Sequence, residues 1–114
     1  MVLSKGEKIL VIRRRLFEKD IRRHFVGEIE EVSAELVRIT GFAFIFDETN
    51  NDYKRRSKPQ TNVFSLVDAG IAVILLPKEI DLEAIRYRMN DKGHRVLTDG
   101  KSYSLQVSEF GPNV

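Results

Sequence analysis

The sequence predicts a mainly β protein: a small, strongly bent antiparallel barrel with a C-terminal hairpin extension and at most one short helix. Three observations lead to this prediction. Leu36 to Phe46 is a run of eleven residues, rich in β-branched and aromatic types and free of proline. Gly41 interrupts that run, where a missing side chain is typical of a bulge, a sharp bend or a close backbone approach. Asn90 to Gly93 and Asp99-Gly100 are turn sequences typical of hairpins.

The chain has 114 residues, of which 42% are hydrophobic and 32% charged, so we expect a single domain over residues 1–114. A domain of this size buries roughly 65% of its unfolded surface and needs no metal or disulfide to fold. It has no cysteine, which excludes thiol chemistry and fits a cytoplasmic protein. The longest strongly apolar run, Ala69 to Leu76, is far too short for a membrane-spanning helix, and the first residues lack a signal-peptide core. We therefore expect a cytoplasmic protein with no membrane partner.

Two strands are expected before the long central run. Ile9 to Ile12 form an apolar block that predicts a strand buried on both faces, and Glu18 to Arg23 read as a connection. His24 to Val32 resumes an extended pattern, with Phe25 and Ile29 on one face. Ser33 and Ala34 then form a tight connection into the central strand.

After the central strand, Asp47 to Gln60 contains many loop-forming residues and predicts a long exposed loop. Thr61 to Asp68 alternates like a strand, and the apolar segment Ile71 to Leu76 predicts a central or covered strand. For the following segment we expect one helical turn near Asp81 to Ala84 and then a strand. The alternative is an α+β fold with a helix over residues 79–91, because the apolar spacing there fits both periods.

The central run is apolar on much of both faces, and a small barrel has only one interior. Its second face therefore needs cover from another subunit or from the C-terminal hairpins. An acidic stretch from Glu28 to Glu35 follows the first basic block, and such a two-signed surface suits self-association. The function expected from these features is that of a non-enzymatic small β-barrel, an interaction module that assembles as a homo-oligomer.

Common catalytic motifs are absent from the sequence, including phosphate-binding loops, nucleophile elbows and zinc-binding helices. The two histidines, His24 and His94, are seventy residues apart, which disfavours a metal site. Asp68 lies between apolar strands and is expected to accept hydrogen bonds at the Ala69-Gly70 turn rather than to act as a catalyst. An enzymatic reading would depend on Asp68, His24 and the glutamates alone. We therefore expect no enzyme, no catalytic residue, no cofactor, no metal and no small-molecule substrate.

The alternative function is binding of RNA or single-stranded nucleic acid through two basic blocks, at residues 13–23 and 54–58. Lysine and arginine would neutralise phosphates and an aromatic ring would stack on an unpaired base. The candidate binding residues are Arg13, Arg15, Arg22, Arg23, Tyr53, Lys54, Arg55, Arg56 and Lys58. Tyr53 is the candidate stacking residue, whereas the stripe Phe42, Phe44 and Phe46 is expected in the core or in a subunit interface.

The segment Phe25 to Ile39, FVGEIEEVSAELVRI, resembles the first motif of the Sm-like small barrels. The resemblance lies in a strand with hydrophobic-x-Gly-x-hydrophobic, a short connection and an alternating strand. It implies a bent barrel and ring-like self-assembly, and an SH3-like barrel would give the same signals. Members of the family bind RNA through an Asp near the connection and an Asn just after it, where this chain has Ser33 and Leu36. The family's second motif is also absent, because the matching stretch ends in Asp68-Ala69-Gly70. The resemblance therefore carries no RNA-binding residue to this chain.

Overall fold

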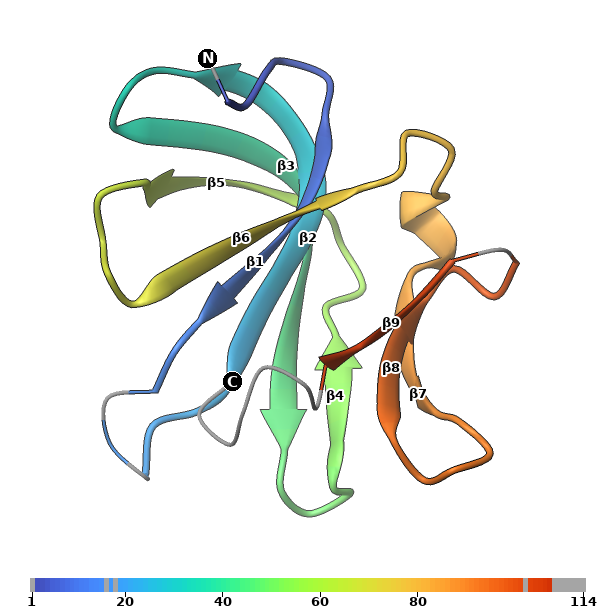
Figure 1. Ribbon diagram of the computed structural model, residues 1–114. Coiled ribbons are helices and arrows are strands. Elements are labelled where there is room, and N and C mark those ends of the chain that lie inside the picture. Colours follow the sequence, from blue (N-terminus) through green and yellow to red (C-terminus); the bar gives the residue numbers. More distant parts are fainter. Residues whose placement is uncertain (1, 16, 18, 102, 108–114) are drawn as a thin grey trace.

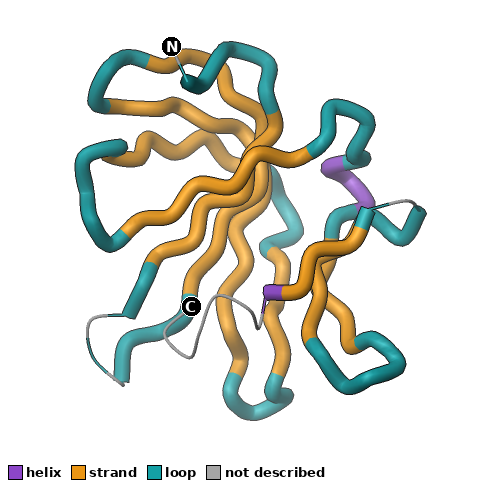
Figure 2. Tube along the Cα trace, in the orientation of Figure 1, coloured by secondary structure: helices purple, strands orange, loops and turns teal. Residues whose placement is uncertain are grey.

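The computed structural model describes residues 2–15, 17, 19–101 and 103–107, which form two antiparallel β-sheets (Figure 1). Strands and loops make up almost all of this part of the chain, with little helix (Figure 2). The elements are β1 (Lys8–Arg13), β2 (Arg23–Val32), β3 (Leu36–Asp47), β4 (Asp52–Arg55), β5 (Gln60–Ser65), β6 (Ile71–Leu76), the 3-10 turn η1 (Leu82–Ala84), β7 (Arg86–Met89), β8 (Arg95–Thr98) and β9 (Ser104–Gln106).

The larger sheet has the strand order β4-β3-β2-β1-β6, and β5 also pairs with β3. β3 is long enough to pair with β5 over Leu36 to Gly41 and with β4 over Phe44 to Asp47. The chain thus forms a meander whose last strand, β6, returns to pair with β1. In the described part of the chain β5 and β6 are not paired with each other, so the sheet is curled and open rather than closed into a barrel. The mainly β antiparallel prediction is confirmed, and closure of the barrel is not observed.

β2 and β3 approach each other closely at a pair of glycines, Gly27 and Gly41. A Cβ atom on Gly41 would lie 2.5 Å from the Cα of Gly27, and one on Gly27 would lie 2.5 Å from the carbonyl oxygen of Thr40. Real Cβ atoms do not approach backbone so closely, so only glycine fits at either position. The predicted close backbone approach at Gly41 is confirmed.

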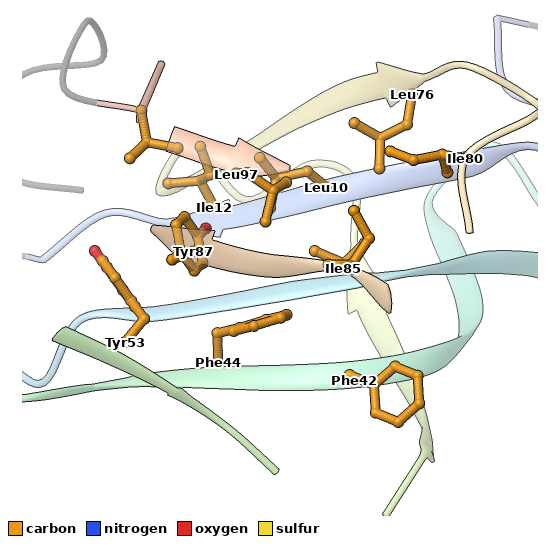
Figure 3. Close-up of a cluster of buried hydrophobic side chains, with 12 residues drawn as sticks. Leu10, Ile12, Phe42, Phe44, Tyr53, Leu76, Ile80, Ile85, Tyr87 and Leu97 are labelled. Carbon is orange, nitrogen blue, oxygen red and sulfur yellow. The ribbon is translucent and has the colours of Figure 1, made fainter. Parts of the chain in front are cut away.

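The alternating side chains of β1 and β2 divide between two cores, one on each face of the curled sheet. Ile9 and Val11 point into its concave side, whereas Leu10 and Ile12 point toward the smaller sheet. We call the first group the inner core: it contains Ile9, Val11, Phe25, Ile29, Val37 and Ile39. We call the second group the inter-sheet core (Figure 3): it contains Leu10, Ile12, Val26, Phe42, Phe44, Tyr53, Leu76, Ile80, Ile85, Tyr87, Leu97 and Val107.

The smaller sheet, β7-β8-β9, covers the second apolar face of β3 (Figure 1). The turn η1 and the strand β7 occupy the segment for which a helix over 79–91 was the alternative, so that alternative is wrong. Alternation explains the outcome, because Ile85 and Tyr87 are both buried whereas Arg86 and Arg88 are exposed. Of the two sources of cover expected for this face, the C-terminal strands of the same chain provide it.

Two further expectations about strands differ from the structure, one of them only in part. The polar segment Asp47 to Gln60 is not one loop, because β4 forms within it and pairs with the end of β3. β6 is not central, because it pairs only with β1 in the described part of the chain. It is partly covered: Leu76 is buried and Ile71, Val73 and Ile74 pack against the two cores, whereas Leu75 is half exposed. Both differences come from long-range pairing, which a local sequence pattern does not specify.

Candidate functional site

A cleft of about 820 Å³ opens at one end of the curled sheet. Five parts of the chain form its walls: the end of β1, the β1–β2 connection, the start of β2, the second half of β3, and the segment from Arg56 into β5. The antiparallel register explains why segments distant in the sequence meet here. Arg13 at the end of β1 pairs with Arg23 at the start of β2, and Arg23 pairs in turn with Ile45 in β3.

The cleft is strongly basic. Six of its lining residues are cationic: Arg13, Arg14, Arg15, Arg23, Arg56 and Lys58. The first four belong to the basic block at 13–23 and the last two to the block at 54–58, so the fold brings the two blocks together. One acidic side chain, Asp20, also lines the cleft, and its carboxylate accepts a 3.1 Å hydrogen bond from the backbone N–H of Phe17.

Most of these cations have no acidic partner. Among the described residues, no carboxylate lies within ion-pair distance of the side chains of Arg13, Arg14, Arg23, Arg56 or Lys58. Five cations without an ion pair among the described residues therefore surround one concave site, where the field is focused. Such a site attracts anions.

The floor of the cleft is apolar and continuous with the inner core. Val11, Phe25, Ala43 and Phe64 line it, and the rings of Phe25 and Phe64 lie 5.5 Å apart between centroids. An apolar floor beneath a rim of charged groups is typical of sites that hold an organic anion rather than a bare ion.

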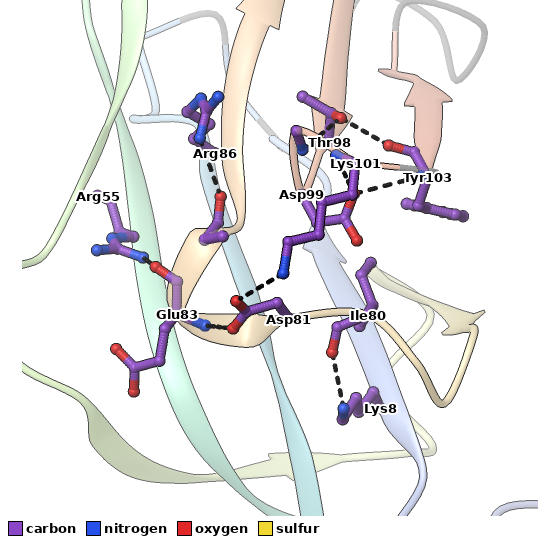
Figure 4. A network of polar contacts seen from close by, with 12 residues as sticks. Lys8, Arg55, Ile80, Asp81, Glu83, Arg86, Thr98, Asp99, Lys101 and Tyr103 are labelled. Carbon is purple, nitrogen blue, oxygen red and sulfur yellow. Dashed lines mark hydrogen bonds and ion pairs between the residues drawn. The ribbon is translucent and has the colours of Figure 1, made fainter.

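Four predicted binding residues, Arg22, Tyr53, Lys54 and Arg55, do not line this cleft. Arg55 instead joins β4 to the turn η1, because its guanidinium donates a 2.6 Å hydrogen bond to the carbonyl oxygen of Glu83 (Figure 4). The guanidinium also lies 4.4 Å from the ring centre of Phe42. Its positive charge therefore has a structural role.

Tyr53 is not available to stack on a base. Its side chain is buried in the inter-sheet core, where its ring stacks on those of His24 and Tyr87 at centroid distances of 4.7 and 4.4 Å. The expectation of an exposed stacking residue is wrong because neighbouring side chains of a strand point to opposite faces. Arg56 therefore faces the cleft while Tyr53 faces the core.

His24 forms a buried polar contact within this aromatic cluster. Its Nδ1 atom shares a hydrogen bond with the hydroxyl of Tyr87, and its Nε2 atom has no partner in the part of the chain that the structure describes. Burial, with a smaller contribution from the charge of Arg22, lowers the pKa of His24 from 6.5 to about 4. Burial also raises the pKa of Tyr53 and of Tyr87. His24 is therefore a neutral core residue at pH 7.

Asp68, the carboxylate considered as a catalytic candidate in the sequence, has a structural partner. Asp68 accepts a 2.8 Å hydrogen bond from the backbone N–H of Gly70, as expected for a turn residue. Within the described ranges, no three His, Cys, Asp or Glu residues lie close enough to hold a metal ion.

The same ranges contain no helix with the length and apolarity needed to cross a membrane.

The sequence analysis missed several lining residues, among them Arg14 and three residues of β5, Gln60, Asn62 and Phe64. For the β5 residues the signal is a two-residue period, because Gln60, Asn62 and Phe64 line the cleft and Thr61 and Val63 do not. Along the lining strip from Arg56 to Phe64 two cations come first, interspersed with Ser57 and Pro59, and two amides and one aromatic ring follow.

The class of structure is thus a pair of antiparallel sheets with a basic, apolar-floored cleft on the concave side of the larger one. Comparison of the chain with protein-family models, with curated proteins and with solved structures finds no match.

Proposed function

We propose that the protein is a non-enzymatic binding module whose cleft binds the sugar–phosphate backbone of single-stranded nucleic acid. The observation that carries this proposal is the convergence of six cationic side chains, from two basic blocks, on one concave site. A regular array of phosphates is a partner that can neutralise several cations at once. Release of condensed counterions from the nucleic acid then drives the association.

A single strand fits the shape better than a duplex does. The cations line the walls of a recess instead of standing on a protruding helix or hairpin, and the recess has an apolar floor. Proteins that bind single strands combine a positively charged groove with apolar or aromatic surface for the unpaired bases. The base pairs of a duplex would keep the bases away from that floor.

Fluorescence anisotropy with a labelled twelve-nucleotide RNA tests the proposal. Binding should weaken steeply with salt, with a slope of log K against log[salt] of about −0.7 per phosphate contact. The double substitution Arg56→Glu/Lys58→Glu should lower the affinity by at least tenfold and make the slope shallower. The matched control is the double substitution Arg88→Glu/Lys92→Glu, which makes the same change of charge at two exposed positions outside the cleft. Equal affinities for the wild type and the double variant would refute the proposal.

Self-assembly is a second candidate function, and the open edges of the larger sheet favour it. β5 and β6 each lack a second partner strand in the described part of the chain, and Val63 and Leu75 on these strands are 58% and 50% exposed. Unpaired edges with exposed apolar side chains are templates for pairing with another chain. Sedimentation velocity should show a homo-oligomer that Val63→Lys and Leu75→Lys dissociate. A monomer at high protein concentration would exclude this candidate.

A relation to the Sm-like and SH3-like small barrels is also part of the proposal. Its support is the strand order, in which β6 returns to pair with β1 and leaves β5 and β6 as the two edges that closure would join. A cytoplasmic location belongs to the proposal as well, because a chain without cysteine gains no disulfide from an oxidising compartment.

A further inference from the structure

We propose that the cleft holds one unpaired nucleotide of the bound strand, with its base against Phe64 and its polar edge read by the side-chain amides of Gln60 and Asn62. This inference deepens the proposed function and rests on it. The proposed function needs phosphate contacts and apolar contact with unpaired bases of any kind, whereas this inference predicts that the protein distinguishes one base from another.

The pairing of β5 with β3 sets the direction of these side chains. Asn62 pairs with Ile39 and Phe64 pairs with Val37, and both partners belong to the inner core. Gln60, Asn62 and Phe64 therefore lie on the concave face. The residues between them face outward: Thr61 bonds to the hydroxyl of Thr40 at 2.8 Å. The outward side chain of Val63 is mostly exposed.

The two amides are unused by the protein. In the part of the chain that the structure describes, neither the Gln60 nor the Asn62 side chain makes a hydrogen bond. Each amide offers two N–H donors and one carbonyl acceptor. Asn62 is half-buried beside apolar side chains, and its amide atoms remain accessible from the cleft. A ligand with complementary donors and acceptors would satisfy both groups.

The chemistry of the strip matches the parts of a nucleotide in order. Arg56 and Lys58 at its start suit a phosphate, which accepts hydrogen bonds from cations. The amides of Gln60 and Asn62 suit a base edge, which presents donors and acceptors side by side. Phe64 at its end offers an aromatic face for the flat surface of the base. The cleft volume of about 820 Å³ is within the range of small-molecule sites, ~300–1,000 Å³.

The test compares binding of labelled oligo(A), oligo(U) and oligo(C) with binding of inorganic polyphosphate, which has charge but no base. The wild-type protein should prefer one homopolymer over another by about tenfold, the discrimination expected of one well-placed amide pair. Gln60→Ala/Asn62→Ala should reduce that preference to less than about twofold and leave polyphosphate affinity unchanged. Thr61→Ala, on the outward face of the same strand, is the matched control and should keep the preference.

A second measurement does not depend on how the variants fold. In the wild-type protein, a nucleoside monophosphate should shift the NMR signals of the Asn62 and Gln60 side-chain NH₂ groups, and ribose 5-phosphate should not. Equal affinity for all homopolymers would overturn the inference and leave the proposed function standing. The same holds if the NH₂ signals respond equally to the nucleoside monophosphate and to ribose 5-phosphate. Absence of binding to polyphosphate and to every homopolymer would overturn both.

Discussion

The imidazole of His24 and the hydroxyl of Tyr87 form a hydrogen bond that joins the two sheets. His24 comes from β2 and Tyr87 from β7, and both side chains are almost completely buried. The ring of Phe44 packs edge-on against Tyr87 at 5.1 Å, so the polar contact lies within an apolar surround. Two predictions about stability follow from this one contact.

The first prediction concerns removal of the hydroxyl. Tyr87→Phe keeps the ring and its packing but leaves Nδ1 of His24 without a partner in the core. The free energy of unfolding should fall by ~1–3 kcal/mol, measured by urea denaturation at pH 7. Tyr103→Phe is the control, because the hydroxyl of Tyr103 makes no hydrogen bond in the described part of the chain. An equal effect of the two substitutions would contradict the structural role of the His24 contact.

The second prediction is a loss of stability in mild acid. The pKa of His24 falls from 6.5 to about 4 on folding, so between these pH values the unfolded chain binds a proton that the folded protein does not. Stability is therefore full above pH 6.5 and declines as the pH falls toward 4. The His24 contribution to this decline is about 3 kcal/mol, at ~1.36 kcal/mol per pKa unit.

The measurement is a series of urea denaturation curves between pH 7 and pH 4.5. His24→Gln should flatten the dependence of stability on pH between 6.5 and 5, a range above most carboxylate titration. His94→Gln, at an exposed turn position, should keep the wild-type dependence. If the His24→Gln protein lost stability as steeply as the wild type, another group would be responsible.

The third prediction concerns the contact between Gly27 and Gly41. Gly41→Ala places a Cβ atom against the backbone of β2, which cannot move without breaking the pairing of the two central strands. We expect a loss of at least ~1–3 kcal/mol, the usual cost of overpacking. In Gly70→Ala the added Cβ would meet only the Asp68 side chain, at 3.2 Å, so this control should be milder. Thermal melts followed by circular dichroism compare the two proteins, and similar melting temperatures would argue against the close approach.

The sequence predicted the central strand and its shelter because Leu36 to Phe46 is long, uniform and apolar on both faces. The sequence left open whether another subunit or the C-terminal strands cover the second apolar face of β3, because that depends on how β7 to β9 pack against the larger sheet. It did not predict β4, whose four residues include one apolar side chain, Tyr53. A strand this short exists because it pairs with the end of β3, and local propensity contributes little.

Some features of the candidate site were also predictable from the sequence, and others depend on the fold. Its two basic blocks are visible in the sequence as charge clusters, but their convergence depends on β3, which pairs with Arg23 at Ile45 and accepts a backbone hydrogen bond from Arg56 at Ala43. Which residues of the second block face the cleft depends on the alternation of side chains along the extended segment from Tyr53 to Arg56. Arg56 faces the cleft, whereas Arg55 and Tyr53 face the smaller sheet. Gln60 and Asn62 carry no signal individually. They become candidates only when the fold turns both toward the same recess.

The last prediction uses the neighbours Arg55 and Arg56, which have the same charge but different surroundings. Arg55 bonds to the carbonyl oxygen of Glu83 and covers Phe42, so Arg55→Gln should lower the free energy of unfolding by ~1–3 kcal/mol and leave RNA affinity nearly unchanged. Arg56 is exposed, lines the cleft and has no acidic partner among the described residues. Arg56→Gln should therefore leave stability within ~0.5 kcal/mol and weaken RNA binding several-fold. Urea denaturation and anisotropy titrations of both variants check the pair. Loss of binding in Arg55→Gln alone would mean that RNA contacts the inter-sheet side of β4, and the cleft would not be the binding site.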